Sequence, residues 1–377
     1  MNIIHVITGI RKAAGTSVFC CEVANGLVAA GNEVTIAVGN PNRKDRYSLD
    51  PRVKLISIAS LLHPTNDQSL TTTIHNPLTT NHYPLPTNHY DLVHIHALWS
   101  PLLHRVSKWA KKNGIPVVWS PHGMLQKWAL KNKWWKKFIA LALYQWRDLK
   151  NSDLLHATAQ TEVEDIRRLH LGNKIVVAPL GVKVYDGADR INREEGSKVL
   201  LFVSRVQRKK GLQVLIDAWA KLPIETTTGW KVRIVGPDQD NHTSELKKQC
   251  ERLGVIDSFS FVGPKYGTEL DEEYLKADLF VLPTHSENFG SVVVEALAHR
   301  VPVICSQGAP WKELEEHCCG WWPANSVEAL SATLQNALSR SRNELQSMGE
   351  RGRMLVEEKY TWDAVVKKMV EGYEGVI

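Results

Sequence analysis

Two carboxylates and a glycine form the most chemically informative stretch of this sequence. Glu287 and Glu295 follow the apolar run 279–282, and Gly290 lies between them. A glycine at a strand-to-helix turn lets backbone approach a ligand closely, and the helix N-terminus then offers free N–H groups to a phosphate. Glu295 falls one turn into this helix among valines and alanines, so its carboxylate needs a basic side chain or ligand hydroxyls as partner. The alternative is an exposed glutamate on an ordinary helix.

A second stretch, 204–211, supplies positive charge. Arg205, Arg208, Lys209 and Lys210 follow the β-branched run 199–203, at the carboxyl end of a strand, where open α/β sheets bind ligands. Arginine offers a planar fork and lysine a compact charge, and both suit a diphosphate. Taken alone, the same residues could form a solvated basic turn.

Short β-branched runs alternate with helical stretches along the whole chain, which predicts repeated βαβ units and parallel sheets. A length of 377 residues suits two domains. We place an N-terminal domain at 1–182 and a C-terminal domain at 183–359, with a helix at about 360–377 packing back on the first. The expected strands are 3–8, 33–38, 53–57, 91–96, 116–119, 153–157, 174–178, 199–203, 231–235, 258–262, 279–282 and 302–305.

Together these motifs resemble the retaining GT-B glycosyltransferases of the group 1 class, family four, over nearly the whole chain. The N-terminal matches are the segment 14–17, a glycine loop, and the segment 120–124 after a predicted strand. The resemblance implies an α/β fold of two Rossmann-like, doubly wound domains facing a central cleft. It implies a nucleotide-diphosphate sugar as donor substrate, with no cofactor and no metal.

The resemblance also assigns roles. Family equivalents of Arg205 and Lys210 bind the donor diphosphate, Glu287 the donor sugar and Glu295 the ribose, while His122 reaches sugar and diphosphate across the cleft. The roles at the diphosphate and the donor sugar make His122, Glu287, Arg205 and Lys210 the expected catalytic residues. The other expected donor contacts, including the part that cups the base, are Gly15, Val262, Lys265, Asn288, Phe289, Gly290 and Ser291.

The chain departs from the family at two places. The usual P-N-G-V-D run at the hinge reads Pro-Leu-Gly-Val-Lys at 179–183, and the first loop carries one glycine, Gly15, where two are frequent. The family mechanism implies that the nucleoside diphosphate leaves and the acceptor hydroxyl attacks from the same face, so that configuration is retained. The acceptor would be a glycan or polyprenyl-linked hydroxyl, as in bacterial surface polysaccharide synthesis. Two rivals are a GT-B-like nucleotide-sugar epimerase and a non-catalytic glycan-binding protein.

Two patterns suggest metal sites, and we interpret both otherwise. Asp238 and Asp240 form a D-x-D pair, but they follow a strand-like run away from the two motifs above, so we expect turn or helix-cap chemistry. His75, His82 and His89 recur every seven residues within 63–90, where the prolines prevent a helix that would align them. We expect a solvated loop there.

Positive charge is concentrated in the first half. Residues 1–185 hold 22 Lys and Arg against 11 Asp and Glu, whereas the remainder holds 24 against 29. Many of these cations alternate with tryptophans in 127–150, a pattern typical of helices at an anionic membrane surface. The alternative is that Trp134, Phe138, Leu141 and Trp146 are core residues beside a solvated lysine face. We see no nucleic-acid-binding module.

The remaining features concern the compartment. The N-terminus lacks a signal-peptide pattern, and no apolar run approaches the length of a membrane span. The six cysteines have no C-x-x-C spacing, so we expect buried, reduced thiols. We therefore expect a cytoplasmic protein, held on the inner face of the plasma membrane if the Trp/Lys stretch binds lipid.

Overall fold

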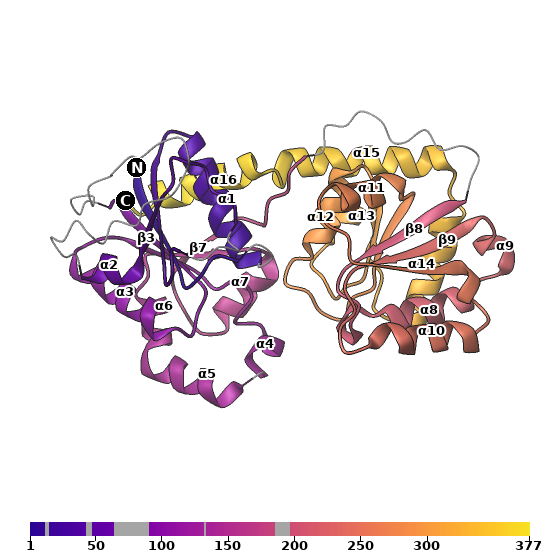
Figure 1. Cartoon of the computed structure of the whole chain (residues 1–377), viewed down its shortest axis with the longest axis horizontal. Coiled ribbons are helices and arrows are strands. Elements are labelled where there is room, and N and C mark those ends of the chain that lie inside the picture. The colour runs from indigo at the N-terminus through magenta and orange to yellow at the C-terminus, as the bar shows by residue number, and fades with distance from the viewer. Residues whose placement is uncertain (12–14, 43–46, 64–89, 132, 185–196) are drawn as a thin grey trace. The chain divides into compact units, whose positions relative to one another are not determined.

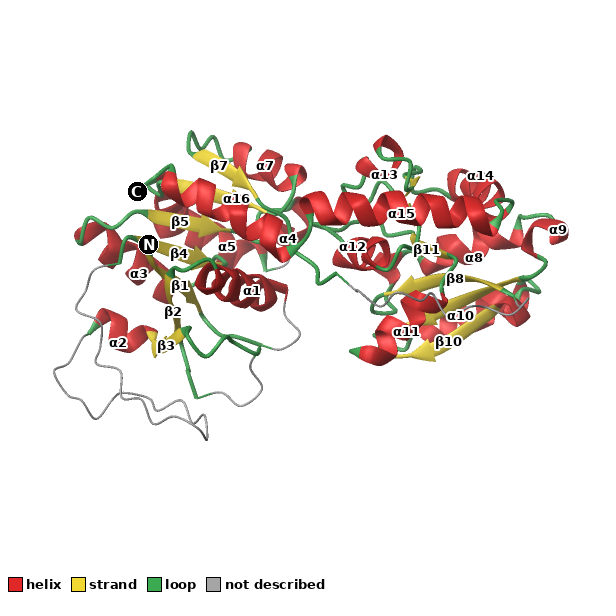
Figure 2. Cartoon of the chain, turned by 90° about the horizontal axis from the view of Figure 1, so that it is seen from above, coloured by secondary structure: helices red, strands yellow, loops and turns green. Residues whose placement is uncertain are grey.

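The computed structural model describes residues 1–11, 15–42, 47–63, 90–131, 133–184 and 197–377. The chain forms two compact units, one of residues 1–181 with 362–377 and one of residues 182–361. Each unit is built around one parallel sheet with helices on both faces (Figures 1 and 2). The expected histidine-rich loop, with His75, His82 and His89, lies outside the described residues.

The first unit contains a seven-stranded sheet of order β3-β2-β1-β4-β5-β6-β7. Its strands are β1 (Asn2–Ile7), β2 (Glu33–Val38), β3 (Lys54–Ser57), β4 (Leu92–His96), β5 (Val117–Ser120), β6 (Leu154–Ala157) and β7 (Lys174–Val177). The strand order reverses between β1 and β4, which makes the sheet doubly wound.

Helices cover both faces of this sheet. They are α1 (Gly15–Ala29), α2 (Ile58–Leu62), α3 (Pro101–Lys112), α4 (Lys127–Lys131), α5 (Trp134–Ala140), the π-helical turn η2 (Leu141–Gln145), α6 (Trp146–Lys150), α7 (Gln160–Arg167) and the C-terminal α16 (Trp362–Glu374). Strand alternation separates two cores: Ile3 and Ile7 face α1 and α16, whereas Ile4 and Val6 face the side of α2, α3 and α7.

The second unit contains a six-stranded sheet of order β10-β9-β8-β11-β12-β13. Its strands are β8 (Lys198–Val203), β9 (Trp230–Val235), β10 (Phe259–Gly263), β11 (Leu279–Leu282), β12 (Val303–Cys305) and β13 (Gly320–Trp321). Every expected strand of the chain is present, and its ends differ by at most one residue. The two-residue β13 is an addition, too short to be predicted from periodicity.

Two helical layers enclose the second sheet. In the one layer, α8 packs against α10 and α14; in the other, α12 packs against α15 (Figure 1). The helices of this unit are α8 (Leu212–Ala220), α9 (Ile224–Thr227), α10 (His242–Arg252), α11 (Thr268–Lys276), α12 (Ser291–Ala298), α13 (Glu313–Glu316), α14 (Val327–Leu338) and α15 (Arg342–Lys359), with short 3₁₀ turns η3 (Arg208–Lys210) and η4 (Ile256–Ser258).

Candidate active site

Two of the expected site residues meet where the strand order of the second sheet reverses. Lys210 ends the turn η3 after β8, and Glu287 lies in the loop after β11, the strand next to β8. The Lys210 ammonium forms an ion pair with the Glu287 carboxylate. Only 11% of the lysine side chain and 17% of the glutamate side chain are exposed. Open α/β sheets bind ligands at this edge, outside the carboxyl ends of the strands.

Backbone contacts fix the two segments that carry this pair. Gly211 has a φ of +72°, and a Cβ there would lie 1.9 Å from the carbonyl oxygen of Pro283, so only glycine fits. The Lys209 carbonyl accepts hydrogen bonds from the His285 N–H (2.9 Å) and the Thr284 hydroxyl (3.2 Å). The basic turn and the loop after β11 are thus joined through main-chain groups on both sides of Lys210.

The start of α12 lies directly after this loop. Gly290 adopts a φ of +80° at the N-cap position of the helix and, being a glycine, supplies no side-chain cap. Trp311 donates its indole N–H to the Phe289 carbonyl, and its ring contacts the Phe289 ring. The Glu287 N–H donates to the Gly308 carbonyl at 2.7 Å. These contacts with Trp311 and Gly308 fix the loop. The backbone N–H groups in the first turn of a helix such as α12 can bind an anion.

Glu295 is a partly buried carboxylate with a defined partner. Its Oε2 accepts a hydrogen bond of 2.9 Å from the Tyr274 hydroxyl on α11, and the Ser291 side chain also donates to it. Burial raises the pKa of Glu295, and the hydrogen bonds from Tyr274 and Ser291 offset part of that effect. Among the described residues the partner of Glu295 is thus a phenol, and the simple exposed-glutamate interpretation is wrong.

Arg205 is exposed and lies beside the D-x-D segment. Its guanidinium donates to the Gln239 side chain at 3.3 Å, and Val206 forms a β-bridge with Asp238. The expectation that this segment lies away from Arg205 is wrong, because β8 and β9 are neighbours and their carboxyl-end loops run together. Asp238 accepts from the Thr243 N–H at 3.1 Å at the start of α10, which confirms the expected helix-cap chemistry.

The segment expected to cup a base follows β10. Val262 is partly buried at the end of that strand, and the Gly236 N–H donates to the Gly263 carbonyl at 2.9 Å. Lys265 pairs with Glu269 on α11 at 3.3 Å. Asn288, next to Glu287, is partly buried. The second unit thus gathers its expected residues around the carboxyl edge of one sheet, and among them Lys210 contacts Glu287 and Ser291 contacts Glu295.

In the first unit, His122 occupies a strained turn after β5. Its φ is +52°, and Ala97 and Trp99, which follow the neighbouring β4, also have positive φ. The His122 Nε2 lies 3.0 Å from the His96 Nδ1. Burial, together with the neighbouring His156, lowers the pKa of His122 to about 3. The imidazole is therefore neutral near pH 7, and it can offer a hydrogen bond to a ligand but no charge.

Glu162, which the sequence did not single out, holds the turn that carries His122. This carboxylate is fully buried at the start of α7. It accepts hydrogen bonds from the Gly123 N–H and from both the N–H and the hydroxyl of Thr158. A buried carboxylate that satisfies donors on two loops fixes the backbone next to His122. The signal for it would have been an acidic residue in an otherwise apolar helix face.

The glycine loop is described only in part, because residues 12–14 lie outside the described range. Gly15 is exposed at the first position of α1, and a Cβ there would meet nothing within 4 Å. One turn later, the Phe19 ring lies 5.3 Å from the His122 ring. The first unit thus places Gly15 and His122 on segments that pack together through Phe19.

Two families of known proteins match this chain, one over each structural unit. The family described as "Glycosyl transferases group 1" matches residues 188–354, and "Glycosyltransferase Family 4" matches residues 13–184. The chain belongs to the group 1, family 4 glycosyltransferases. Two matched regions, one for each structural unit, together cover most of this glycosyltransferase.

Individual relatives agree with this assignment. A D-inositol 3-phosphate glycosyltransferase from Thermomonospora curvata is 27% identical over 97% of this chain and 92% of its own length. One from Segniliparus rotundus is 26% identical over 60% of this chain, and this match spans about half (53%) of that relative. Other curated relatives are likewise matched over about half of their length.

Solved structures share the fold at low sequence identity. Anabaena Alr3699/HepE in complex with UDP and glucose has a TM-score of 0.70, with 15% identity and full coverage of both chains. WaaG, a glycosyltransferase involved in lipopolysaccharide biosynthesis, has a TM-score of 0.64, with 16% identity and 99% coverage of both chains. These neighbours support the GT-B architecture of this glycosyltransferase.

The basic aromatic stretch of the first unit forms an exposed surface. Over α5 and η2 its large apolar side chains are mostly exposed: Trp134 65%, Trp135 53%, Phe138 66%, Ile139 48% and Leu143 67%. The interpretation that Trp134 and Phe138 are core residues is wrong, although the Trp146 ring does pack on the core, and its indole N–H donates to the Leu169 carbonyl. Lys131, Lys133 and Lys136 are exposed beside these rings. The side chains of Lys127 and Trp128 lie outside the described residues.

Two remaining expectations concern membranes and cysteines. Among the described residues, the structure contains no helix that is long and apolar enough to span a membrane. The six cysteines are free thiols, and five of them are buried. Cys318 is exposed, contrary to expectation, because it lies in the turn after α13 with a φ of +50°.

Proposed function

We propose that this glycosyltransferase moves a hexose-type sugar from a nucleotide-diphosphate sugar to a hydroxyl of a glycan or lipid-linked acceptor, with retention of configuration and without a metal. The observation that carries the proposal is the Lys210–Glu287 pair beside the glycine-led start of α12, at the carboxyl edge of β8 and β11. A cation for the leaving phosphate and a carboxylate for sugar hydroxyls lie there side by side. The complexes of Alr3699/HepE with UDP and with UDP-glucose support the choice of donor class.

The proposed reaction breaks the bond between the anomeric carbon and the phosphate oxygen. Lys210 and Arg205 stabilise the negative charge that grows on the departing diphosphate. An ammonium has three N–H donors, so Lys210 can keep its bond to Glu287 while it binds a phosphate oxygen. The acceptor oxygen bonds to the anomeric carbon from the face that the diphosphate leaves, and its proton passes to a phosphate oxygen. In this scheme Glu295 holds the ribose, and Val262 and Lys265 contact the base.

His122 and Gly15 contribute from the first unit in this proposal. A neutral imidazole suits a hydrogen bond to a sugar or phosphate oxygen, and the start of α1 leaves room for a ligand at Gly15. The names of relatives in inositol phosphate and lipopolysaccharide glycosylation support a hydroxyl acceptor on a polyol or lipid-linked glycan. We assign the reaction to bacterial surface polysaccharide synthesis on this basis.

A thermal-shift screen tests the donor class. UDP-, GDP-, ADP- and dTDP-sugars are added to the full chain with and without EDTA. We expect one base to raise the melting temperature, with no effect of EDTA. If none of the four kinds of nucleotide sugar raised the melting temperature, the proposal would be contradicted. A rise in melting temperature that EDTA abolished would contradict metal independence. Analysis of the donor after incubation without acceptor separates transfer from epimerisation, since an epimerase would change the sugar.

We further propose that the surface formed by Trp134, Trp135, Phe138, Ile139 and Leu143 lies on an anionic membrane, and call it the aromatic surface. Exposed apolar rings of this size are costly in water, and the neighbouring lysines match lipid phosphates. Lys136 lies over the Trp135 ring, 5.2 Å from its centroid. This arrangement would place the glycosyltransferase on the cytoplasmic face of the plasma membrane, close to a lipid-linked acceptor.

A further inference from the structure

A row of polar side chains crosses one face of the first sheet, on the side covered by α1 and α16. Nearer the amino ends of β1, β4, β5 and β6, the residues on this face are apolar: Ile3, Leu92, Val118 and Leu154. Two residues onward on each strand, alternation places polar side chains on the same face: His5, His94, Ser120 and His156, followed by His96. All five are fully buried. Burial of so many polar groups is affordable only if they bond to one another.

One set of these side chains forms a chain of hydrogen bonds with a fixed direction. The His156 Nε2 donates to the Ala178 carbonyl at 2.7 Å, so its Nδ1 is an acceptor. The Ser120 hydroxyl, 2.7 Å away, therefore donates to His156 and accepts from the His94 Nε2 at 2.6 Å. The His94 Nδ1 then accepts from the Tyr373 hydroxyl of α16 at 2.6 Å. A single backbone carbonyl thus sets every proton position in this series of hydrogen bonds.

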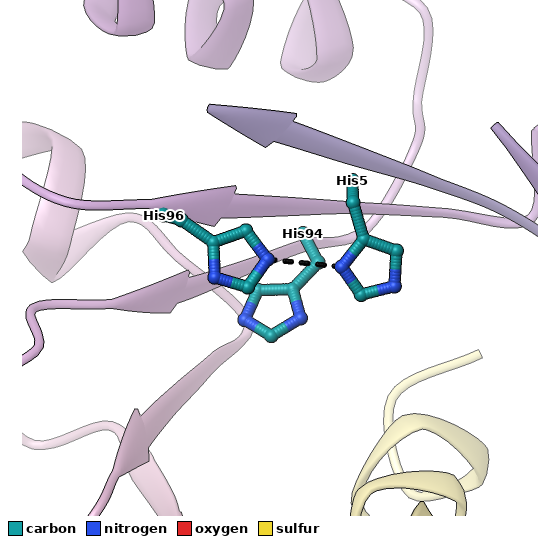
Figure 3. A group of neighbouring side chains, drawn as sticks. All are labelled: His5, His94 and His96. Carbon is teal, nitrogen blue, oxygen red and sulfur yellow. Dashed lines mark hydrogen bonds between the residues drawn. The ribbon is translucent and has the colours of Figure 1, made fainter. Parts of the chain in front are cut away.

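A second chain ends at His122. The His5 Nδ1 lies 2.9 Å from the His96 Nε2 (Figure 3), and the His96 Nδ1 lies 3.0 Å from the His122 Nε2. Burial lowers the pKa of His5 to about 3 and that of His96 well below its usual value, so these rings are neutral. In a neutral imidazole one nitrogen donates and the other accepts, so the three tautomers are linked.

The linked tautomers have two possible directions. In one, His5 donates to His96 and His96 donates to His122, which leaves the His122 proton on Nδ1. In the other, every bond is reversed, and a proton lies on the His5 Nε2. That nitrogen is buried and has no partner among the described residues. An orphaned buried N–H is rarer than an orphaned acceptor, so the first direction is favoured.

A metal ion at the same place fits less well. His5, His94 and His96 have ring nitrogens within 4.8 Å of one another. A tetrahedral zinc ion would hold neighbouring nitrogens roughly 3.3 Å apart, given zinc–nitrogen bonds of about 2.0–2.1 Å. The His5 and His96 nitrogens are closer, at 2.9 Å, and both nitrogens of His94 and of His96 already take part in hydrogen bonds. The contacts therefore describe a hydrogen-bonded chain.

We propose that His5 and His96 are positioning residues that hold His122 as its Nδ1–H tautomer, so that this imidazole offers the donor substrate a fixed hydrogen-bond donor. His96 is the hydrogen-bond partner of the His122 Nε2, and no described residue forms a hydrogen bond with the His122 Nδ1. An oxygen of the sugar or phosphate is the matching ligand group. The use of this donor rests on the proposed function, whereas the tautomer is a property of the protein alone.

The test is two-bond ¹H–¹⁵N NMR on the full chain labelled with ¹⁵N-histidine, with His122 identified by its loss in His122→Gln. We expect wild-type His122 to be neutral with its proton on Nδ1. His96→Phe keeps a ring but removes both nitrogens, and we expect it to move the His122 proton to Nε2 or to a mixture. It should also raise the donor KM about tenfold, the value of one hydrogen bond, with a smaller change in kcat. His5→Asn keeps an N–H donor and should retain the Nδ1–H form.

Tyr373→Phe is the matched control, because it interrupts the other series of hydrogen bonds, from Tyr373 to His156, in the same buried row. It should leave the His122 tautomer unchanged. An Nε2–H tautomer in the wild type would overturn the proposal even if no variant folds. So would an unchanged tautomer in His96→Phe, or a stoichiometric metal ion that remains bound to purified wild type and is lost in His5→Asn. A confirmed tautomer with no donor binding would leave this inference standing and contradict the proposed function instead.

Discussion

Lys210 and Glu287 form an ion pair across the point where the strand order of the second sheet reverses, with most of both side chains withdrawn from solvent. The lysine comes from the turn after β8 and the glutamate from the loop after β11, 77 residues later. Each charge compensates the other in a partly dry environment, where an unpaired charge is costly. The pair therefore serves the fold and the proposed donor site together.

A double-mutant cycle should reveal this coupling. Lys210→Ala leaves the Glu287 carboxylate without its partner, whereas the Lys210→Ala/Glu287→Ala variant removes both charges. In urea titrations, we expect the loss of unfolding free energy in the double variant to differ by about 1–3 kcal/mol from the sum of the losses in Lys210→Ala and Glu287→Ala. The neighbouring pair Arg208–Glu245 is more exposed, at 72% and 49% of the side chains, and serves as control. Its coupling should stay below about 1 kcal/mol. Equal coupling in the two cycles would refute the special role of the buried pair.

Glu162→Gln tests the support of the His122 turn. The amide can no longer accept from all three donors, because its NH₂ group meets an N–H or hydroxyl donor. We expect a loss of about 1.5–3 kcal/mol in unfolding free energy, the range for hydrogen bonds to charged groups. Glu164→Gln, on the exposed side of the same helix, should change stability by less than about 0.5 kcal/mol. Similar stabilities for the two variants in thermal unfolding would contradict the assignment.

Glu295 should impose a pH dependence on stability. Burial raises its pKa in the folded chain, so the folded state binds its proton more tightly than the unfolded state does. Stability from this group is present below the unfolded pKa and is lost as pH rises through the folded pKa. Glu295→Gln removes that loss, so the melting temperature of this variant should rise relative to that of wild type as the pH increases above the ordinary glutamate pKa of about 4. The exposed Glu225→Gln should show no such trend, and a parallel pH profile for Glu295→Gln would contradict the burial argument.

The aromatic surface should bind anionic vesicles. In flotation with phosphatidylglycerol vesicles, we expect wild type to float and Trp134→Ala/Trp135→Ala/Phe138→Ala to remain in the soluble fraction. Lys133→Glu/Lys136→Glu should weaken binding at least tenfold, because each basic residue near such a surface contributes about 1 kcal/mol. Ile224→Ala/Lys248→Glu changes an exposed apolar and an exposed basic residue in the second unit and should float like wild type. Full flotation of both surface variants would exclude this surface as the lipid contact.

Local patterns were sufficient to predict the sheets. The runs before Ser204 and before Pro283 are continuous and apolar, as strands covered on both faces are, and their loops hold Lys210 and Glu287. The sequence therefore placed both residues at strand ends. Their pairing depends on β8 and β11 being neighbours across the reversal of strand order, which no local pattern specifies.

Other parts of the candidate site could not be predicted from local patterns. The phenol of Tyr274 reaches Glu295 only because α11 and α12 lie together, and Glu162 reaches Gly123 across 39 residues. The sequence held a weaker signal for the row of buried polar side chains on the first sheet. His94 and His96 are two residues apart on one strand, so alternation places them on the same face. The partners His5 and Tyr373 come from opposite ends of the chain. His5 reaches His96 through the pairing of β1 with β4, and Tyr373 reaches His94 through the packing of α16 against the first sheet.

The most direct test of the central claim is calorimetric titration of the full chain with UDP, GDP, ADP and dTDP, repeated with Lys210→Ala and Arg208→Ala. We predict that wild type binds one of these nucleotides at a single site. Lys210→Ala should bind it at least tenfold more weakly, because a charge-assisted bond to phosphate is lost, and Arg208→Ala should bind like wild type. Unchanged affinity in Lys210→Ala, or no nucleotide binding by wild type, would contradict the account of the donor site.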